Sequence, residues 1–438
     1  MTTKPDFNRM EKTRREYLTK IRELAGVEFD SNKWEEVKKL VYGVAPLDVD
    51  VIIDDTTLRE GIQMAGIASP HPSDACRIAC MLRDIGVERL EVLTYTKSDQ
   101  EAVTRMKDEG LGNMIAAWCR AAKEDIDLAL KLDFKQVGIS HPVSYIHFEK
   151  WADKHLDQIF ERVAESIEYA KQHGLSIFVH GEDSTRAEWE FEKTFINTAA
   201  DAGASVYRIC DTVGCGMSDP RAPLPQGIPA KVKKIKEETR IPYVEIHAHD
   251  DLGNAVENTM ATIRAASGLY DKVYASTTFL GIGDRAGGAE TEKIVMNCYM
   301  HHGIKKWNLA PLRELAVFIS SSTNYPLPVN KAIVGDAAFA HESGIHVHGV
   351  STLPLTYELF PPELVGHERT IVVGKRSGKH GVRLKLEEVL KRKVDENDPR
   401  LAQLVEVIKK KFVEGRRRYP IGEDEIKQLA RKVGFYEI

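Results

Sequence analysis

The sequence lacks the features that mark several specialised classes of protein. Its six cysteines form no C-x-x-C pair, which argues against zinc-ribbon and thioredoxin-like motifs. No apolar run approaches the roughly 18 residues of a membrane span, and the polar N-terminus lacks the apolar segment of a secretory signal. The net charge is only −5, so neither nucleic acid nor a membrane surface is an expected partner. We expect a cytoplasmic protein with free, mostly buried thiols.

The composition is that of an ordinary globular protein. The chain has 438 residues, of which 42% are hydrophobic and 29% are charged. This is enough for an extensive core and for two or three domains.

Eight short apolar runs, separated by longer amphipathic segments, repeat from residue 51 onward. Alternating strands and helices favour a parallel sheet, and eight repeats over about 250 residues are typical of a TIM barrel. A doubly wound sheet is the alternative, but it favours a glycine-rich loop after the first strand, where this chain has TTLREG. We predict an α/β fold with a TIM (β/α)8 barrel. The runs cover residues 51–54, 89–94, 113–118, 134–140, 175–180, 205–210, 243–248 and 272–276.

We divide the chain into three parts. Apolar residues at helical spacing predict an N-terminal helical extension over residues 1–48. The catalytic TIM barrel is expected at residues 49–294, and a helical accessory or lid region at 295–438, where the alternation stops. The last part contains His341, His346 and His348. These offer either a second metal site or an acid–base histidine over a barrel mouth, in the same or a partner subunit.

Polar residues gather where the predicted strands end. In a TIM barrel the carboxyl ends of the strands form the catalytic rim, so these side chains are expected to converge. They lie in residues 55–60, 180–183, 211–212, 247–251 and 281–285. Their clustering on one rim indicates catalysis more strongly than any single motif does.

His247 and His249 predict a metal site at this rim. They are spaced i, i+2, so on a strand both face the same way, together with Glu245. Two imidazoles and a carboxylate are ligands for a divalent metal ion. Glu60 offers a further carboxylate, and Arg59 can donate two hydrogen bonds to a carboxylate or a developing enolate. A structural H-x-H pair and an Arg–Glu surface pair are the alternatives.

Two more strand ends contribute candidates by their alternation. Residues at even spacing along a strand face the same side of the sheet. Glu182 therefore faces the same way as His180, and Thr212 faces the same way as Arg208. An arginine inside a packed barrel is costly to bury unless it is paired. Arg208 therefore meets either a substrate carboxylate or an internal Asp or Glu, and both alternatives are open.

Seven stretches carry a family resemblance: DDTTLREGIQ, EDSTR, DTVGC, EIHAHDDLGNAVEN, LGIGDRAGG, AFAHESGIHVHGV and LTYEL. Together they resemble the acyl-transferring branch of the DRE-TIM metallolyase family, which holds isopropylmalate, homocitrate, citramalate and Re-type citrate synthases. The resemblance covers residues 51 to about 375. It implies a TIM barrel followed by helical subdomains, in a homodimer that exchanges them. The long N-terminal extension looks most like that of the Re-citrate synthases.

The resemblance also implies an activity and residue roles. The protein would condense acetyl-CoA with a 2-oxoacid on a divalent metal and then hydrolyse the thioester. Mn²⁺ is the expected ion, with Mg²⁺, Co²⁺ or Zn²⁺ as alternatives. The implied metal ligands are Glu60, His247 and His249, the implied catalytic residues are Arg59, Glu182, His346 and Tyr357, and the implied substrate contacts include Arg120 and Thr212.

Sequence differences from the homocitrate synthases bear on the acceptor, that is, on which 2-oxoacid receives the acetyl group. Phe178 and His180 replace an arginine and a serine, and Arg208 stands where a small residue is usual. Arg120, His180 and Arg208 would then place positive charge near the mouth, while Phe178 would narrow the space for 2-oxoglutarate. We therefore expect oxaloacetate as the acceptor and citrate as the product. Gly288 replaces a metal-ligating asparagine of many relatives, as it does in homocitrate synthases.

Several other functions are compatible with parts of this pattern. Homocitrate, isopropylmalate and citramalate synthases, or a synthase acting on an oxaloacetate analogue, share the implied chemistry. A lyase similar to hydroxymethylglutaryl-CoA lyase shares the barrel and the metal site. A catalytically silent binding barrel would not need the intact motifs. A biotin-dependent carboxyltransferase would need a strand lysine, which none of the predicted strand ends carries.

Overall fold

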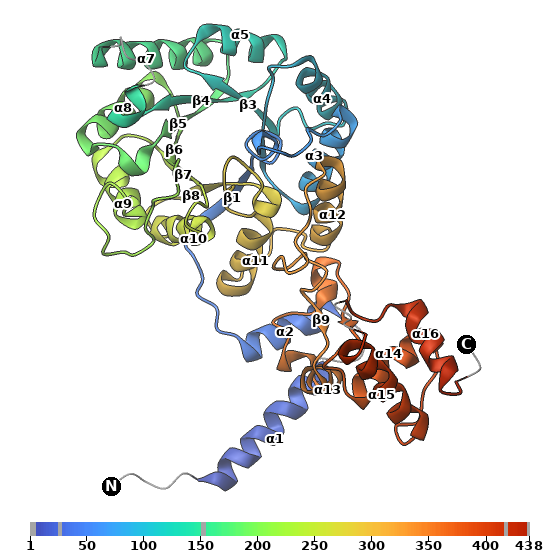
Figure 1. Ribbon diagram of the computed structural model, residues 1–438. Coiled ribbons are helices and arrows are strands. Elements are labelled where there is room, and N and C mark those ends of the chain that lie inside the picture. Colours follow the sequence, from blue (N-terminus) through green and yellow to red (C-terminus); the bar gives the residue numbers. More distant parts are fainter. Residues whose placement is uncertain (1–5, 25–28, 150–154, 416–418, 436–438) are drawn as a thin grey trace. The chain divides into compact units, whose positions relative to one another are not determined.

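The computed structural model describes residues 6–24, 29–149, 155–415 and 419–435. The chain forms two compact units (Figure 1). One unit runs from Gly43 to Leu327, and the other combines Met1–Tyr42 with Pro328–Ile438. Among the described residues, no helix is both long enough and apolar enough to span a membrane.

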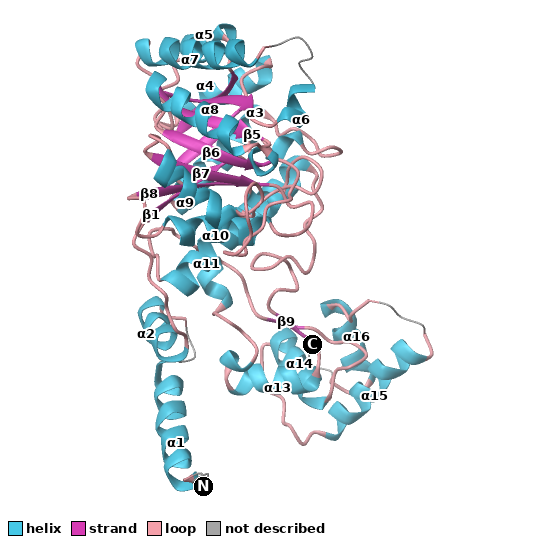
Figure 2. Cartoon of the chain, turned by 90° about the vertical axis from the view of Figure 1, so that its left-hand side faces the viewer, coloured by secondary structure: helices cyan, strands magenta, loops and turns pink. Residues whose placement is uncertain are grey.

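The Gly43–Leu327 unit contains a closed barrel of eight parallel strands in sequence order, which confirms the predicted TIM barrel (Figures 1 and 2). The last strand closes on the first in a continuous register, from Asp50 beside Lys272 to Asp55 beside Thr277. The strands are β1 (Asp50–Asp55), β2 (Arg89–Val92), β3 (Ile115–Arg120), β4 (Gln136–Pro142), β5 (Ser176–Glu182), β6 (Val206–Asp211), β7 (Tyr243–Ala248) and β8 (Lys272–Thr277).

Helices between the strands cover the outside of the barrel (Figure 2). Local sequence signals set their ends. Thr96 and Asp99 form a reciprocal capping box at the start of α4, and Gly86, in the left-handed region with φ 100°, ends α3. The helices are α3 (Pro72–Ile85), α4 (Lys97–Asp108), α5 (Lys123–Lys131), the short α6 (Tyr145–Phe148), α7 (Leu156–Gln172), α8 (Trp189–Ala202), α9 (Ile228–Glu238) and α10 (Ala255–Ala266).

The barrel unit is larger than the segment 49–294 that the sequence predicts. The helix α11 (Thr291–His302) follows β8 and is the eighth helix of the barrel. The next helix, α12 (Leu312–Thr323), packs on α3 and fully buries Leu315 and Ile319. No strand follows β8 in the barrel, so the alternation in the sequence stops before the unit does. The unit therefore extends to Leu327 rather than 294.

The two faces of the barrel strands differ in chemistry. Outward-facing residues such as Ile53, Ile139 and Val179 are fully buried beneath the helices. On the inward face, Phe178 belongs to a small apolar cluster with Ala116 and Val206. Other inward-facing side chains, on β1, β2, β6 and β7, are charged. They are Asp54, Glu91, Arg208 and Glu245, and all four are fully buried.

The second unit has an apolar core of its own. Leu386, Leu404 and Ile426 are fully buried among its last three helices. Its first helix, α1, buries Ile21, whereas α2 buries Trp34, Val37 and Lys38. The elements are α1 (Phe7–Leu24), α2 (Ser31–Val41), β9 (Ala340–His341), α13 (Gly344–Thr352), β10 (Thr370–Ile371), α14 (Lys379–Leu390), α15 (Pro399–Val413) and α16 (Glu423–Lys432).

Candidate active site

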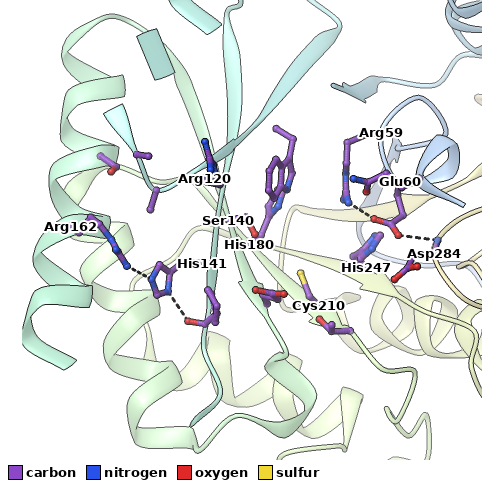
Figure 3. Close-up of a pocket in the computed structure, with 18 of the residues that line it drawn as sticks. Arg59, Glu60, Arg120, Ser140, His141, Arg162, His180, Cys210, His247 and Asp284 are labelled. Carbon is purple, nitrogen blue, oxygen red and sulfur yellow. Dashed lines mark hydrogen bonds and ion pairs between the residues drawn. The ribbon is translucent and has the colours of Figure 1, made fainter. Parts of the chain in front are cut away.

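A cavity of about 1120 Å³ lies at the carboxyl ends of the barrel strands (Figure 3). This is the end of the barrel where the rim motifs predict the site. Residues from strands on opposite sides of the barrel meet here, although they are far apart in the sequence. The predicted site residues that line the cavity are Arg59, Glu60, Arg120, His180, Glu182, Thr212, His247 and His249.

The three predicted metal ligands are brought together. One ligand atom each from Glu60, His247 and His249 lies within 4.8 Å of the other two. The Glu60 Oε1 and His249 Nε2 atoms are 3.9 Å apart, and the two imidazole rings stand at 89° to each other. All three residues are buried. Two imidazoles and a carboxylate in this arrangement fit a divalent metal ion with positions left for oxygen ligands.

The surroundings keep the two imidazoles in the form that binds a metal. Burial, together with the neighbouring His249, holds the pKa of His247 well below its usual value, and burial also lowers the pKa of His249. Both rings are therefore neutral at neutral pH. The His247 Nδ1 atom lies 2.9 Å from the Ser276 hydroxyl oxygen. A hydrogen bond at Nδ1 leaves Nε2 as the ligand atom.

Glu60 is held by the loop after β1. Its Oε1 atom accepts a hydrogen bond of 3.3 Å from the Asp284 backbone amide. The next residue must be small, because a Cβ on Gly61 would lie 3.0 Å from Ile282 Cγ1. The TTLREG loop and the loop after β8 thus pack closely, which places the Glu60 carboxylate beside the histidines.

Arg59 lies between Glu60 and a residue that the sequence motifs do not single out. Its Nε donates a hydrogen bond of 2.5 Å to Glu91 Oε1, and its Nη1 contacts Glu60. Glu91 is fully buried in β2. Burial raises the pKa of Glu91, but Arg208 and Arg59 outweigh it and hold this pKa well below its usual value. Glu91 is therefore an anion beneath the rim.

The structure corrects the prediction that Arg208 binds substrate. Arg208 is fully buried and does not line the cavity. Its guanidinium contacts Asp54, lies 3.0 Å from Glu91 Oε2 and donates a hydrogen bond of 2.9 Å to Glu245 Oε1. The alternative, an internal acidic partner, is therefore the correct one. Glu245 faces the same way as the predicted metal-ligating histidines, but it lies deeper and pairs with Arg208 and Arg89.

His180 lines the cavity but does not bring the positive charge that we expected. It is buried, and its Nε2 lies 3.3 Å from Glu91 Oε2. Burial and the nearby Arg208 lower the pKa of His180 to about 4, so the ring is neutral at neutral pH. Its place depends on Gly138, because a Cβ there would lie 2.5 Å from His180 Nε2.

Phe178 shapes the pocket only from below. Its ring is buried in the apolar cluster and stacks under the Arg89 guanidinium at 3.8 Å. It does not line the cavity. The expectation that Phe178 narrows the acceptor pocket directly is therefore wrong, because parity predicts which face a side chain takes but not its depth along the strand.

The remaining predicted barrel residues keep polar groups at the cavity wall. The Arg120 side chain is 61% exposed and forms an ion pair of 2.8 Å with Asp125. The Glu182 carboxylate lies 3.1 Å from His147 Nδ1. The Thr212 hydroxyl accepts a hydrogen bond of 2.9 Å from the Asp183 backbone amide.

The cavity also extends outward between β3, β4 and the helices that cover them, a region that the motifs do not predict. Arg162 on α7 and His141 on β4 line it, with 2.7 Å between Nη2 and Nε2 (Figure 3). The sequence gives little signal for these residues, because they lie in helices and on outward-facing strand positions. Further residues of this part are Lys123, Glu165 and Tyr169.

His346 and Tyr357, the predicted acid–base residues outside the barrel, lie together in the second unit. Their ring centres are 4.3 Å apart, and the Tyr357 side chain is about half exposed. Gly349 allows this approach, because a Cβ there would lie 2.6 Å from the Tyr357 ring. Their action on a barrel cavity stays a prediction. His341 instead lies 3.3 Å from the buried Glu358 carboxylate.

Comparisons with known proteins find relatives over most of the chain. A family model described as HMGL-like matches residues 50–319, and one described as homocitrate synthase post-HMGL domain-like matches residues 333–415. The homocitrate synthase of Methanopyrus kandleri is 35% identical over 88% of this chain and 92% of its own. The 2-isopropylmalate synthase of Methanocaldococcus jannaschii is 35% identical over 87% of this chain and 73% of its own.

Two further comparisons add another synthase and a solved structure. The (R)-citramalate synthase of Methanocaldococcus jannaschii is 37% identical and covers 77% of this chain and 66% of its own. Among solved structures, the HMG-CoA lyase of Bacillus subtilis has a TM-score of 0.53 at 17% identity, covering 65% of this chain and 97% of its own. At that identity the likeness shows the barrel fold alone.

Proposed function

Since the chain belongs to the HMGL-like family, in the acyl-transferring branch of the DRE-TIM metallolyases, we propose that it condenses acetyl-CoA with a 2-oxoacid and then hydrolyses the thioester. One observation carries the proposal. Glu60, His247 and His249 converge at the catalytic rim of the barrel with Arg59 beside them. The residues of the second unit, His346 and Tyr357, support a synthase rather than a lyase.

The residues divide the work by their positions. A divalent metal held by Glu60, His247 and His249 would supply Lewis acidity to the keto group of the acceptor. Arg59 is buried and fixed by two carboxylates, so its remaining N–H groups are oriented to donate to the developing oxyanion. These donors are in place before the reaction, and no reorganisation is needed when charge develops.

Proton transfer is assigned to residues that reach the cavity or lie in the second unit. Glu182 ends β5 at the cavity wall and would take a methyl proton from acetyl-CoA. His346 and Tyr357, with rings 4.3 Å apart, would move protons during enolisation and hydrolysis. We propose that they act in a homodimer, with the second unit of one subunit serving the barrel of its partner.

The cavity has room for the second substrate. A 2-oxoacid occupies only a small part of about 1120 Å³. The outward region beside Lys123 and Arg162 is therefore proposed for the arm of acetyl-CoA. Thr212 and Arg120, at the cavity wall, are proposed to contact the carboxylates of the acceptor.

The proposal for the acceptor has two parts, its chemical class and its identity. The class, a 2-oxoacid, is supported by the names of the relatives, which are homocitrate, isopropylmalate and citramalate synthases. Oxaloacetate was expected from Arg120, His180 and Arg208, but of these three only Arg120 is a cation at the cavity wall. The relatives favour the alternative, an acceptor of the homocitrate, isopropylmalate or citramalate type, and oxaloacetate stays a candidate.

The test is release of the CoA thiol from acetyl-CoA by the protein loaded with Mn²⁺. The acceptors are 2-oxoglutarate, 2-oxoisovalerate, pyruvate and oxaloacetate. We expect one of them to give the highest kcat/KM, and a preference of about tenfold is a difference of about 1.4 kcal/mol in transition-state binding. His249→Ala should abolish the release, whereas His301→Ala, at an exposed position of α11, should not. Thiol release with none of the four acceptors, combined with cleavage of hydroxymethylglutaryl-CoA, would replace the synthase by a lyase.

A further inference from the structure

Five charged side chains fill the middle of the barrel beneath the candidate metal site, and Arg59 joins them from the rim. The interior of a TIM barrel is usually packed with branched apolar residues, and burying ions removes them from water at a cost of several kcal/mol each. Three guanidinium groups and three carboxylates are nevertheless buried here. They are Asp54, Arg59, Arg89, Glu91, Arg208 and Glu245, which we call the barrel ion cluster.

Arg208 and Arg89 look alike within this cluster but differ in one contact. Both pair with Asp54 and Glu245. Both also lie over the Phe178 ring, at 5.2 Å and 3.8 Å. Arg208 Nη1 additionally lies 3.0 Å from Glu91 Oε2. Within the part of the chain that the structure describes, Arg89 forms no ion pair with Glu91.

Glu91 links Arg208 to the rim. One of its oxygens, Oε2, faces Arg208, while Oε1 accepts the hydrogen bond of 2.5 Å from Arg59 Nε. A carboxylate held between two guanidinium groups has little freedom to rotate. Arg59 in turn contacts the metal ligand Glu60. A continuous row of charge-assisted contacts therefore runs from Arg208, in the centre of the barrel, to the metal site.

We propose that Arg208 is a positioning residue for the reaction: it holds the Glu91 carboxylate in the orientation that aims Arg59 at the acceptor. Arg208 does not touch substrate, and its effect passes through Glu91. The proposal rests on the proposed function, because Arg59 is the group that polarises the keto oxygen there. Arg89 has a structural role only, although it forms as many ion pairs with Asp54 and Glu245 as Arg208 does.

The matched pair Arg208→Met and Arg89→Met tests this assignment. Each removes one guanidinium and leaves Phe178 in place. To avoid an uncompensated buried charge, each is combined with Glu245→Gln, which removes the carboxylate that both arginines share. The readouts are kcat and KM for the acceptor in the thiol-release assay, the Mn²⁺ dissociation constant by calorimetry, and the position of the Arg59 guanidinium in crystal structures of the two double variants.

The two double variants should differ. Arg208→Met with Glu245→Gln is expected to lower kcat about tenfold or more, while the Mn²⁺ dissociation constant changes by less than about threefold. Arg89→Met with Glu245→Gln is expected to keep kcat within about threefold of the Glu245→Gln single variant. A general loss of stability does not produce this difference. Equal losses of kcat in both, or no loss in the Arg208 variant, would overturn the proposal.

Two further experiments test the proposal if a variant does not fold or if the protein shows no activity. If the Arg208 double variant does not fold, Arg208→Lys replaces it with Arg89→Lys as the control. A single ammonium cannot span the three carboxylates that the Arg208 guanidinium contacts. If the wild-type protein releases no thiol with any acceptor, the proposed function fails, and the crystal structures still decide this inference. Arg59 should leave Glu91 in the Arg208 variant and stay in the Arg89 variant.

Discussion

His180→Gln should make the stability of the barrel less dependent on pH. The folded protein holds the pKa of His180 at about 4, because the ring is buried and faces Arg208, whereas an unfolded histidine titrates near its ordinary value of 6.5. The unfolded chain therefore binds a proton in the window between these values, and the folded chain does not. The resulting stabilisation is fully present above pH 6.5 and is lost as the pH falls toward 4.

The magnitude follows from the difference in pKa. A difference of about 2.5 pKa units corresponds to a loss of about 3.4 kcal/mol in the free energy of unfolding once the pH is below both pKa values. At pH 5 about 2 kcal/mol of this loss has occurred. When the pH falls from 7.5 to 5, the free energy of unfolding of the metal-free wild-type protein should therefore decrease by about 2 kcal/mol more than that of His180→Gln. The other buried histidines are common to both proteins, so their contributions cancel in the comparison.

Hydrogen–deuterium exchange of peptides from β4 to β6 measures this quantity in the full chain. Protection, corrected for the intrinsic exchange rate at each pH, reports the free energy of opening of the barrel. His301→Gln, at an exposed histidine of the same unit, controls for the loss of a histidine and should follow the wild type. If the protection of His180→Gln falls as steeply as that of the wild type, His180 is protonated in the folded state and the reasoning is refuted.

Three other predictions follow from particular contacts. Lys231→Met should lower the melting temperature strongly, because it leaves the buried Glu192 without its ammonium partner at a cost of about 3–5 kcal/mol, whereas Lys233→Met, at an exposed position of the same helix, should change stability by less than about 1 kcal/mol. Gly138→Ala should cost about 1–3 kcal/mol by overpacking, since its Cβ would lie 2.5 Å from His180 Nε2, while thermal unfolding of Gly112→Ala, where the nearest atom is 3.8 Å away, should match the wild type. Mixing the inactive variants Glu60→Ala and His346→Ala should restore about a quarter of the wild-type thiol release if subunits share active sites, and no restoration would show that each subunit works alone.

The fold and the clustering of the candidate metal ligands were accessible from the sequence for a simple physical reason. Strand–helix alternation specifies a parallel barrel, and the carboxyl ends of its strands must share one rim. His247 and His249 have the same parity and end a strand, so they face the mouth together. Glu60 joins them because β1 and the loop after β8 lie side by side at the closure of the barrel.

The wrong predictions concern how deep a side chain lies in the barrel and which residues it pairs with. The alternation of side chains along a strand predicts neither of these. Glu245 and Arg208 face inward as predicted, but they lie below the rim, where each finds opposite charges from other strands. His180 reaches the cavity, yet burial rather than its residue type determines its charge. The pairing of Glu91 with Arg59 joins strand β2 to the loop after β1, so neither short segment reveals it.

The most direct test of the central claim is a calorimetric titration of the metal-free protein with Mn²⁺. We expect one equivalent of bound metal per chain, held by Glu60, His247 and His249. His249→Ala should weaken binding by on the order of 100-fold or more, while the exposed control His301→Ala should bind as the wild type does. Absence of Mn²⁺ binding by the wild type, or equal affinity in His249→Ala, would contradict the account.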